Sequence, residues 1–172
     1  SGMAKSTRNH AIKLWGNRFP KGDHRHLAKI LFSYENPPGK KEIAGAQDAI
    51  GIMVPALNYS YYAGEYWPKE IRTVNDEEIL SWLEDKIYLI PLKPRVEGYD
   101  VFNGCQLNEE NARNLSEASE ECFRAILDKD FESFAKNFKK SFEAQVSLFP
   151  ESLHSYIQEE IDKYSNIASG WK

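Results

Sequence analysis

One aspartate, Asp48, is the only charge in a small, apolar segment that runs from Ala44 to Leu57. Gly45 and Gln47 precede it and Gly51 follows it, and glycines at such places let another part of the backbone come close. A carboxylate in this setting can act as a general base, because it accepts a proton from a reacting hydroxyl group. The local sequence on its own favours another role, in which Asp48 is the N-cap of a helix.

The sequence lacks the other common catalytic patterns. It contains no G-x-S-x-G, G-x-x-x-x-G-K-[ST] or G-x-G-x-x-G, so neither hydrolase chemistry nor a familiar phosphate cradle finds support. His24 and His26 point to different sides of an expected helix, so one metal ion cannot easily bind both, and we expect a solvated helix start there. Cys105 and Cys122 show no C-x-x-C spacing, and we expect both to be reduced and structural.

Composition limits the class of protein. At 172 residues and 41% hydrophobic, the chain is long enough for a single domain with its own core. The net charge of -4 and the lack of a Lys/Arg-rich run argue against a nucleic-acid partner. The apolar runs are too short to span a bilayer, and residues 1–8 lack the apolar stretch of a signal peptide, so we expect a cytoplasmic protein without a membrane partner. Ser1 and Gly2, which precede Met3, are interpreted as a cloning remnant.

The spacing of apolar residues predicts an α+β fold made mostly of helices, with a small sheet. The sheet combines a tyrosine-rich hairpin over 57–67, which turns at Ala63 and Gly64, with a buried strand over 87–92. Helices are expected over 7–18, from the cap Asp23 to the Asn36-Pro37 break, from the cap Asn75 to about 86, and from Asn108, Asp130 and Pro150 onward.

Phenylalanines recur at helical spacing in the helix that Asp130 opens. A buried helix face needs large apolar residues at this spacing, so we interpret the stripe as core rather than as a surface that stacks on a cofactor. The stripe consists of Phe131, Phe134, Phe138 and Phe142.

The segment 44–51 reads A-G-A-Q-D-A-I-G and is followed by P-A-L-N at 55–58. It resembles the small-Gly-x-Gln-Asp-x-x-Gly stretch of GHMP kinases, and most closely that of sugar kinases of the galactokinase, fucokinase and heptose-phosphate kinase kind. The resemblance extends over most of the chain, because the expected helices and the 87–92 strand follow in the family's order. It implies an ATP-binding transferase for carbohydrate phosphorylation, in which Asp48 is the general base for attack of a sugar hydroxyl on the γ-phosphate of ATP.

The same resemblance implies further site residues. The family has a magnesium-binding glutamate at a helix end, about a dozen residues before the aspartate, and Glu35 fits this place. Alternatively, Glu35 is an ordinary exposed carboxylate at a helix end. Gly45 and Gln47 are the expected contacts to a sugar or sugar phosphate. Apart from the resemblance, Arg95 or Tyr99 in the polar loop over 93–104 are candidate contributors to sugar specificity. Mg²⁺ and ATP are the cofactors that the parent kinase uses.

On this resemblance the chain is a central and C-terminal piece of a kinase, in which about 1–58 ends the catalytic-aspartate half and about 59–172 resembles the C-terminal domain. The family's glycine- and serine-rich phosphate loop and its C-terminal glycine-rich turn are not found in the sequence. We therefore expect the truncated chain to bind ATP weakly and to be inactive alone. We also expect it to self-associate or to pair with a complementary kinase half, because truncation exposes apolar surface.

A second hypothesis is a non-catalytic module that binds a carbohydrate or a protein through the aromatic hairpin. Half of the residues of an alternating strand point into the core, so ordinary packing is the simpler interpretation of these aromatic side chains. The residues concerned are Tyr59, Tyr61, Tyr62, Tyr66 and Trp67.

Overall fold

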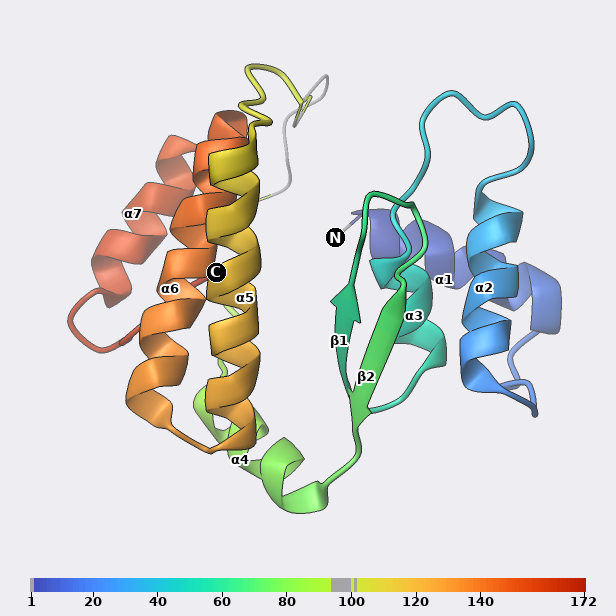
Figure 1. Ribbon diagram of the computed structural model, residues 1–172, viewed down its shortest axis with the longest axis horizontal. Coiled ribbons are helices and arrows are strands. Elements are labelled where there is room, and N and C mark those ends of the chain that lie inside the picture. The colour runs from blue at the N-terminus through green and yellow to red at the C-terminus, as the bar shows by residue number, and fades with distance from the viewer. Residues whose placement is uncertain (1, 94–99, 101) are drawn as a thin grey trace. The chain divides into compact units, whose positions relative to one another are not determined.

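The computed structural model describes residues 2–93, 100 and 102–172, and Figure 1 shows its helices and strands. In this part of the chain, seven α-helices, one 3-10 turn and a two-stranded antiparallel sheet confirm the predicted α+β fold. The chain divides into two compact units, Ser1–Leu80 and Ser81–Lys172. None of the described helices combines the length and the apolar character that crossing a bilayer requires.

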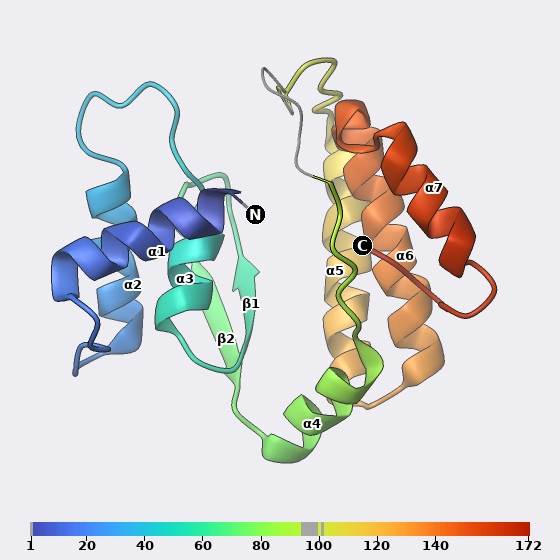
Figure 2. The ribbon, with the colours of Figure 1, turned by 180° about the vertical axis from the view of Figure 1, so that it is seen from behind.

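The N-terminal unit packs three helices with a hairpin. Helix α3 lies between α2 and the hairpin, and α1 packs across α2 and α3 (Figure 2). Leu31 of α2 and Ile50 and Met53 of α3 are the largest fully buried apolar side chains of its core. The elements of this unit are α1 (Gly2–Trp15), α2 (His24–Glu35), α3 (Gln47–Met53), β1 (Leu57–Tyr61) and β2 (Glu70–Val74).

The first two helices begin and end at residues with clear physical roles. Helix α1 ends earlier than predicted because Gly16 takes a positive φ of 68° and donates its N–H to the carbonyl of Ile12 at 2.7 Å. The predicted cap Asp23 is confirmed, since its Oδ1 accepts from the backbone N–H groups of Arg25 and His26 at 2.9 and 3.3 Å.

The sheet is smaller than predicted. β1 pairs antiparallel with β2 from Leu57↔Val74 to Tyr61↔Glu70, so the second strand begins beyond the expected hairpin and Tyr62, Tyr66 and Trp67 lie in the connection. The predicted buried strand over 87–92 is wrong. This segment has no regular structure, and Tyr88 and Leu89 are 86% and 94% exposed. Apolar, β-prone residues there have no neighbouring strand to pair with in the described sheet, and Pro91 offers no N–H for a ladder.

The C-terminal unit is helical, and the paired helices α5 and α6 form its centre. The predicted caps Asn108 and Asp130 are confirmed, because each side chain accepts the backbone N–H three residues on. The serine hydroxyl and N–H of Ser133 lower the pKa of the Asp130 carboxyl by hydrogen bonding to it. The helices here are α4 (Glu77–Lys86), which begins in the first unit, then α5 (Glu109–Leu127), α6 (Phe131–Leu148), the 3-10 turn η1 (Pro150–Ser152) and α7 (Ser155–Tyr164).

Two predicted helix starts are shifted. Asp76 caps α4 in place of Asn75, since its Oδ1 accepts from the N–H groups of Glu78 and Ile79 at 2.9 and 3.1 Å. Pro150 begins only the 3-10 turn, and α7 starts after it at Ser155. The sequence offers two adjacent cap candidates at 75 and 76, and Asp76 directly precedes the first helical residue, Glu77, so its carboxylate reaches the N–H groups two and three residues on.

The phenylalanine stripe of α6 forms core only in part. Phe134 is 4% exposed, and its ring meets the rings of Trp82 and Phe138 at centroid distances of 5.8 and 5.3 Å. Phe131, in the first turn, is 42% exposed.

The C-terminal residues lie along the same helix, where Gly170 approaches the backbone of Ala135. A side chain at Gly170 would collide with that backbone, so glycine is required there.

Candidate functional site

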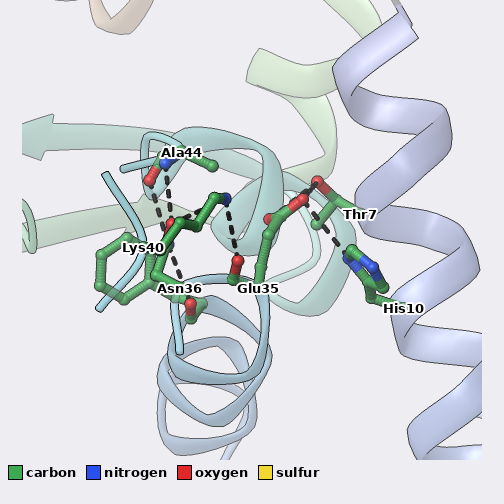
Figure 3. Close-up of polar contacts among 7 residues, drawn as sticks. Thr7, His10, Glu35, Asn36, Lys40 and Ala44 are labelled. Atoms are coloured by element: carbon green, nitrogen blue, oxygen red, sulfur yellow. Dashed lines mark hydrogen bonds and ion pairs between the residues drawn. The ribbon is translucent and has the colours of Figure 1, made fainter. Parts of the chain in front are cut away.

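The most deeply placed acid in the described part of the chain is Glu35, the last residue of α2. It is 8% exposed, and the hydroxyl of Thr7 in α1 lies 2.8 and 3.0 Å from its two carboxylate oxygens (Figure 3). Thr7 is itself buried. The carboxylate therefore belongs to the interface of two helices, and the alternative of an ordinary exposed carboxylate is wrong.

His10 extends this cluster by one turn of α1. Its Nδ1 lies 3.6 Å from Glu35 Oε1, and Figure 3 shows the imidazole turned toward the carboxylate. The ring also meets the ring of Tyr34 edge to face, with centroids 5.6 Å apart. Nδ1 is buried and makes no hydrogen bond within the described residues. A protonated His10 would complete an ion pair with Glu35.

A hydrogen-bonded loop joins this helix end to α3. The side chain of Asn36 donates to the carbonyls of Phe32 and Ala44 at 3.0 and 3.2 Å, and its Oδ1 accepts from the N–H of Ala44 at 2.8 Å. Lys40 donates to the backbone carbonyl of Glu35 at 2.9 Å, which satisfies a free carbonyl at the C-terminus of α2 (Figure 3). One amide thus fixes both ends of the segment that leads from Glu35 to Asp48.

Asp48 lies in the first turn of α3 and is half-buried. It is not the N-cap, so the helix-cap prediction is wrong. Ala46 occupies that position without a side-chain hydrogen bond. A carboxylate in a first turn is stabilised by the partial positive charge of the helix N-terminus. The described residues supply no side-chain hydrogen bond or ion pair to Asp48, and α2 and α3, which carry Glu35 and Asp48, pack against each other.

Gly45 and Gln47 lie together, immediately before Asp48. A Cβ added at Gly45 would collide with the carboxamide of Gln47, so this side chain folds back over the glycine. Gly51 is different, because an added Cβ would meet nothing within 4 Å. The expected close approach of backbone therefore does not occur at Gly51, and at Gly45 the neighbour is a side chain.

Tyr99, together with Arg95, falls outside the described residues. The structure therefore places four of the five predicted site residues, Glu35, Gly45, Gln47 and Asp48, in the N-terminal unit.

The donors around Glu35 fit part of a magnesium site. Mg²⁺ prefers oxygen ligands and is commonly held by one or two carboxylates, with phosphates and water completing the octahedron. Glu35 and Thr7 offer a carboxylate and a hydroxyl within hydrogen-bonding distance of each other. No group of three or more His, Cys, Asp or Glu side chains with metal-binding geometry occurs among the described residues.

Sequence reasoning missed Thr7, His10 and Lys40. Thr7 and His10 are three residues apart, which places them on one face of α1, but nothing in the sequence shows that this face meets a glutamate 28 residues after Thr7. Lys40 follows the proline-rich break after α2, where basic residues near a helix C-terminus commonly bind free carbonyls.

Comparison of the chain with protein-family models, curated proteins and solved structures finds no match.

Proposed function

We propose that this chain is part of an ATP-dependent sugar kinase of the GHMP type, which transfers the γ-phosphate of ATP to a sugar hydroxyl. The supporting observation is the arrangement of the Gly45–Gly51 segment. Its Gln47 and Asp48 begin a helix that packs on α2, and α2 ends at the buried Glu35. The two carboxylates that such a reaction needs are thus carried by two packed helices.

Asp48 is the proposed general base. A half-buried carboxylate without a hydrogen-bonding side chain in the described structure is free to accept the proton of a sugar hydroxyl as its oxygen attacks phosphorus. A general base of this kind contributes about 10²- to 10⁴-fold to the rate. Gly45 and Gln47 are the proposed sugar contacts beside it, and Tyr99 is proposed as a third. The exposed carboxamide of Gln47 can both donate to and accept from sugar hydroxyls.

Glu35 and Thr7 are the proposed protein ligands of magnesium. The ion neutralises phosphate charge when bound, and substrate phosphates would supply the ligands that the chain lacks. In the described structure the Thr7 hydroxyl donates to Glu35, so the same two groups satisfy each other without the metal. His10 at 3.6 Å adds a positive charge to this end of α2 when it is protonated.

The chain alone is proposed to be inactive, since positioning and charge stabilisation supply most of the rate of phosphoryl transfer. A complementary kinase portion would supply the missing phosphate loop. The exposed apolar residues of 87–92 offer a surface for that portion or for self-association. Because ATP and sugar phosphates are cytoplasmic metabolites, a cytoplasmic location belongs to this proposal.

The test compares the chain with a version extended by the translated coding sequence upstream of Met3 and downstream of Lys172. Both proteins are incubated with MgATP and a panel of neutral sugars and sugar phosphates, and ADP formation is measured. We expect activity only in the extended protein and only with some sugars. Sugar-dependent ADP formation by the short chain would contradict its proposed inactivity. No activity in the extended protein with any sugar would contradict the kinase itself.

The hairpin connection favours a second candidate function, which is non-catalytic binding of a carbohydrate or protein. Tyr62 and Tyr66 are both exposed, Tyr66 by 67%, so these side chains are not buried in the core and remain accessible to a ligand. Binding of an oligosaccharide without ATP that is lost in Tyr66→Ala but kept in Asp48→Asn would support this module. The opposite dependence would support the kinase.

A further inference from the structure

The N-terminal unit contains a groove that the kinase proposal does not use. It has a volume of about 310 Å³ and lies between the first two turns of α2 and the segment from Trp67 to Ile71. That volume is at the lower end of the range for small-molecule sites. Apolar residues form its floor and three cations form its rim, and Asp23 and His26 also line it.

The floor is ordered by packing. Trp67 is half-buried and its ring meets that of Phe32 at a centroid distance of 5.6 Å. Pro68 and Ile71 are buried beside it. The backbone of this segment is held because the N–H of Lys69 donates to the carbonyl of Tyr61 at 2.8 Å. Trp67 thus lines the groove with an indole that packs against Phe32.

The rim is positively charged although the whole chain carries a net charge of -4. Arg25 and Lys29 are one helical turn apart on α2, and Lys69 comes from the hairpin side. No carboxylate of the described residues forms an ion pair with any of these three side chains. Among the described residues that line the groove, Asp23 is the one acid, and its Oδ1 accepts from two backbone N–H groups at the start of α2.

Arg25 and Lys29 are exposed, and each has one contact within this part of the unit. Arg25 Nη2 donates to Thr73 Oγ1 at 3.4 Å, and that hydroxyl donates to Asn58 Oδ1 at 2.8 Å. Lys29 Nζ lies 6.0 Å from the centre of the Trp67 ring. An arginine held by one nitrogen keeps further N–H donors for an anion. Cations beside a planar apolar surface suit a ligand that has both an anionic end and a less polar face.

We propose that this groove binds a small phosphate monoester. The phosphate lies between Arg25, Lys29 and Lys69, and the body of the molecule rests on Trp67. A small molecule is favoured over a protein partner because the groove, at about 310 Å³, has the size of a small-molecule site.

The experiment measures binding to the full chain by titration calorimetry and by the indole N–H signals in nitrogen-15 spectra. The probes are glucose 6-phosphate, inorganic phosphate and glucose. We expect saturable binding of glucose 6-phosphate that moves one indole signal, absent in Trp67→Phe, with weaker binding of inorganic phosphate and none of glucose. Equal affinity for glucose and its phosphate, or no saturable binding of either, would overturn the proposal.

Charge-reversal variants locate the site. Lys29→Glu and Arg25→Glu should each weaken glucose 6-phosphate at least about tenfold, the effect expected for loss of a charge-assisted contact. Lys41→Glu is the matched control, because Lys41 is an exposed lysine of the same unit outside the groove. Equal weakening in all three would show non-specific attraction. Asp48→Asn should leave this affinity unchanged, so the site is judged independently of the kinase proposal.

Discussion

In each unit of this protein a charged side chain forms a hydrogen bond with a buried hydroxyl group, and the two charged groups differ in how deeply they are buried. In the N-terminal unit the carboxylate of Glu35 is buried where α1 meets α2, and the Thr7 hydroxyl spans both its oxygens. In the C-terminal unit Lys172 donates to the buried hydroxyl of Ser141. Lys172 is itself exposed, whereas Glu35 lies buried where two helices pack and cannot regain water unless they separate.

The difference indicates which polar group is set in place by the fold. Glu35 is held where two helices pack. The next residue, Asn36, forms side-chain hydrogen bonds to the backbone of Ala44 that fix the loop leading to Asp48. Lys172 rests on α6 next to Trp171, whose ring lies 4.5 Å from Lys139 Nζ. Lys172 is exposed, so its contact with Ser141 does not require a charge to be removed from water. Burial of Glu35 removes a carboxylate from water, and the Thr7 hydroxyl offsets part of that cost.

The largest expected effect comes from a cavity in the core beneath α2, the helix that carries Glu35. Leu31 is fully buried on α2, so Leu31→Ala leaves a cavity and should lower the free energy of unfolding by about 2–5 kcal/mol. Ile30→Ala is the control, because the neighbouring side chain is exposed and should cost much less. Urea unfolding followed by circular dichroism measures both. Equal losses would mean that the α2 face is assigned wrongly.

Removing each hydroxyl in turn should have a smaller effect on stability, and it compares the Thr7–Glu35 contact directly with the Ser141–Lys172 contact. Thr7→Val leaves the Glu35 carboxylate buried without its hydroxyl donor and should cost about 1–3 kcal/mol. Ser141→Ala lets Lys172 return to water and should cost less than about 1 kcal/mol. Denaturation of both variants beside Ser6→Ala, an exposed neighbour of Thr7, tests the contrast. A larger loss in Ser141→Ala would reverse the comparison.

The smallest effect concerns Cys122 in the C-terminal unit. Burial raises the pKa of its thiol from 9.0, and the charge of Lys172 lowers it by a smaller amount. The folded state therefore holds this proton more tightly than the unfolded state, so the cysteine's contribution to stability is present at lower pH and is lost as pH rises above about 9.

Alkylation by iodoacetamide, followed by peptide mass spectrometry, measures this shift. Cys122 should react more slowly in the folded protein than in urea at the same pH, and Lys172→Met should slow it further because the nearby positive charge is gone. Unchanged reactivity in Lys172→Met would show that Lys172 does not lie beside the thiol.

Local signals predicted several helix starts, although the cap predicted at Asp48 is wrong and the start predicted at Asn75 is shifted by one residue. Asp23, Asn108 and Asp130 cap helices as expected, because a cap depends on a side chain and the N–H groups two or three residues later. The 87–92 segment was mispredicted because strand formation needs a partner strand, which local sequence does not specify. The same limit explains the site: the helix end at Glu35 was predictable, but its contact with Thr7 depends on how α1 crosses α2.

Asp48 tests the central claim most directly. In the chain extended by its flanking coding sequence, Asp48→Asn should lower sugar-dependent ADP formation by about 10²- to 10⁴-fold. Glu42→Gln, which changes an exposed carboxylate before the same helix, should leave it unchanged. Both variants should unfold within about 1 kcal/mol of the parent, because neither side chain makes a hydrogen bond in the described structure that its amide would lose. An Asp48→Asn protein that phosphorylates sugar at the parental rate would contradict the assignment of Asp48 as the base.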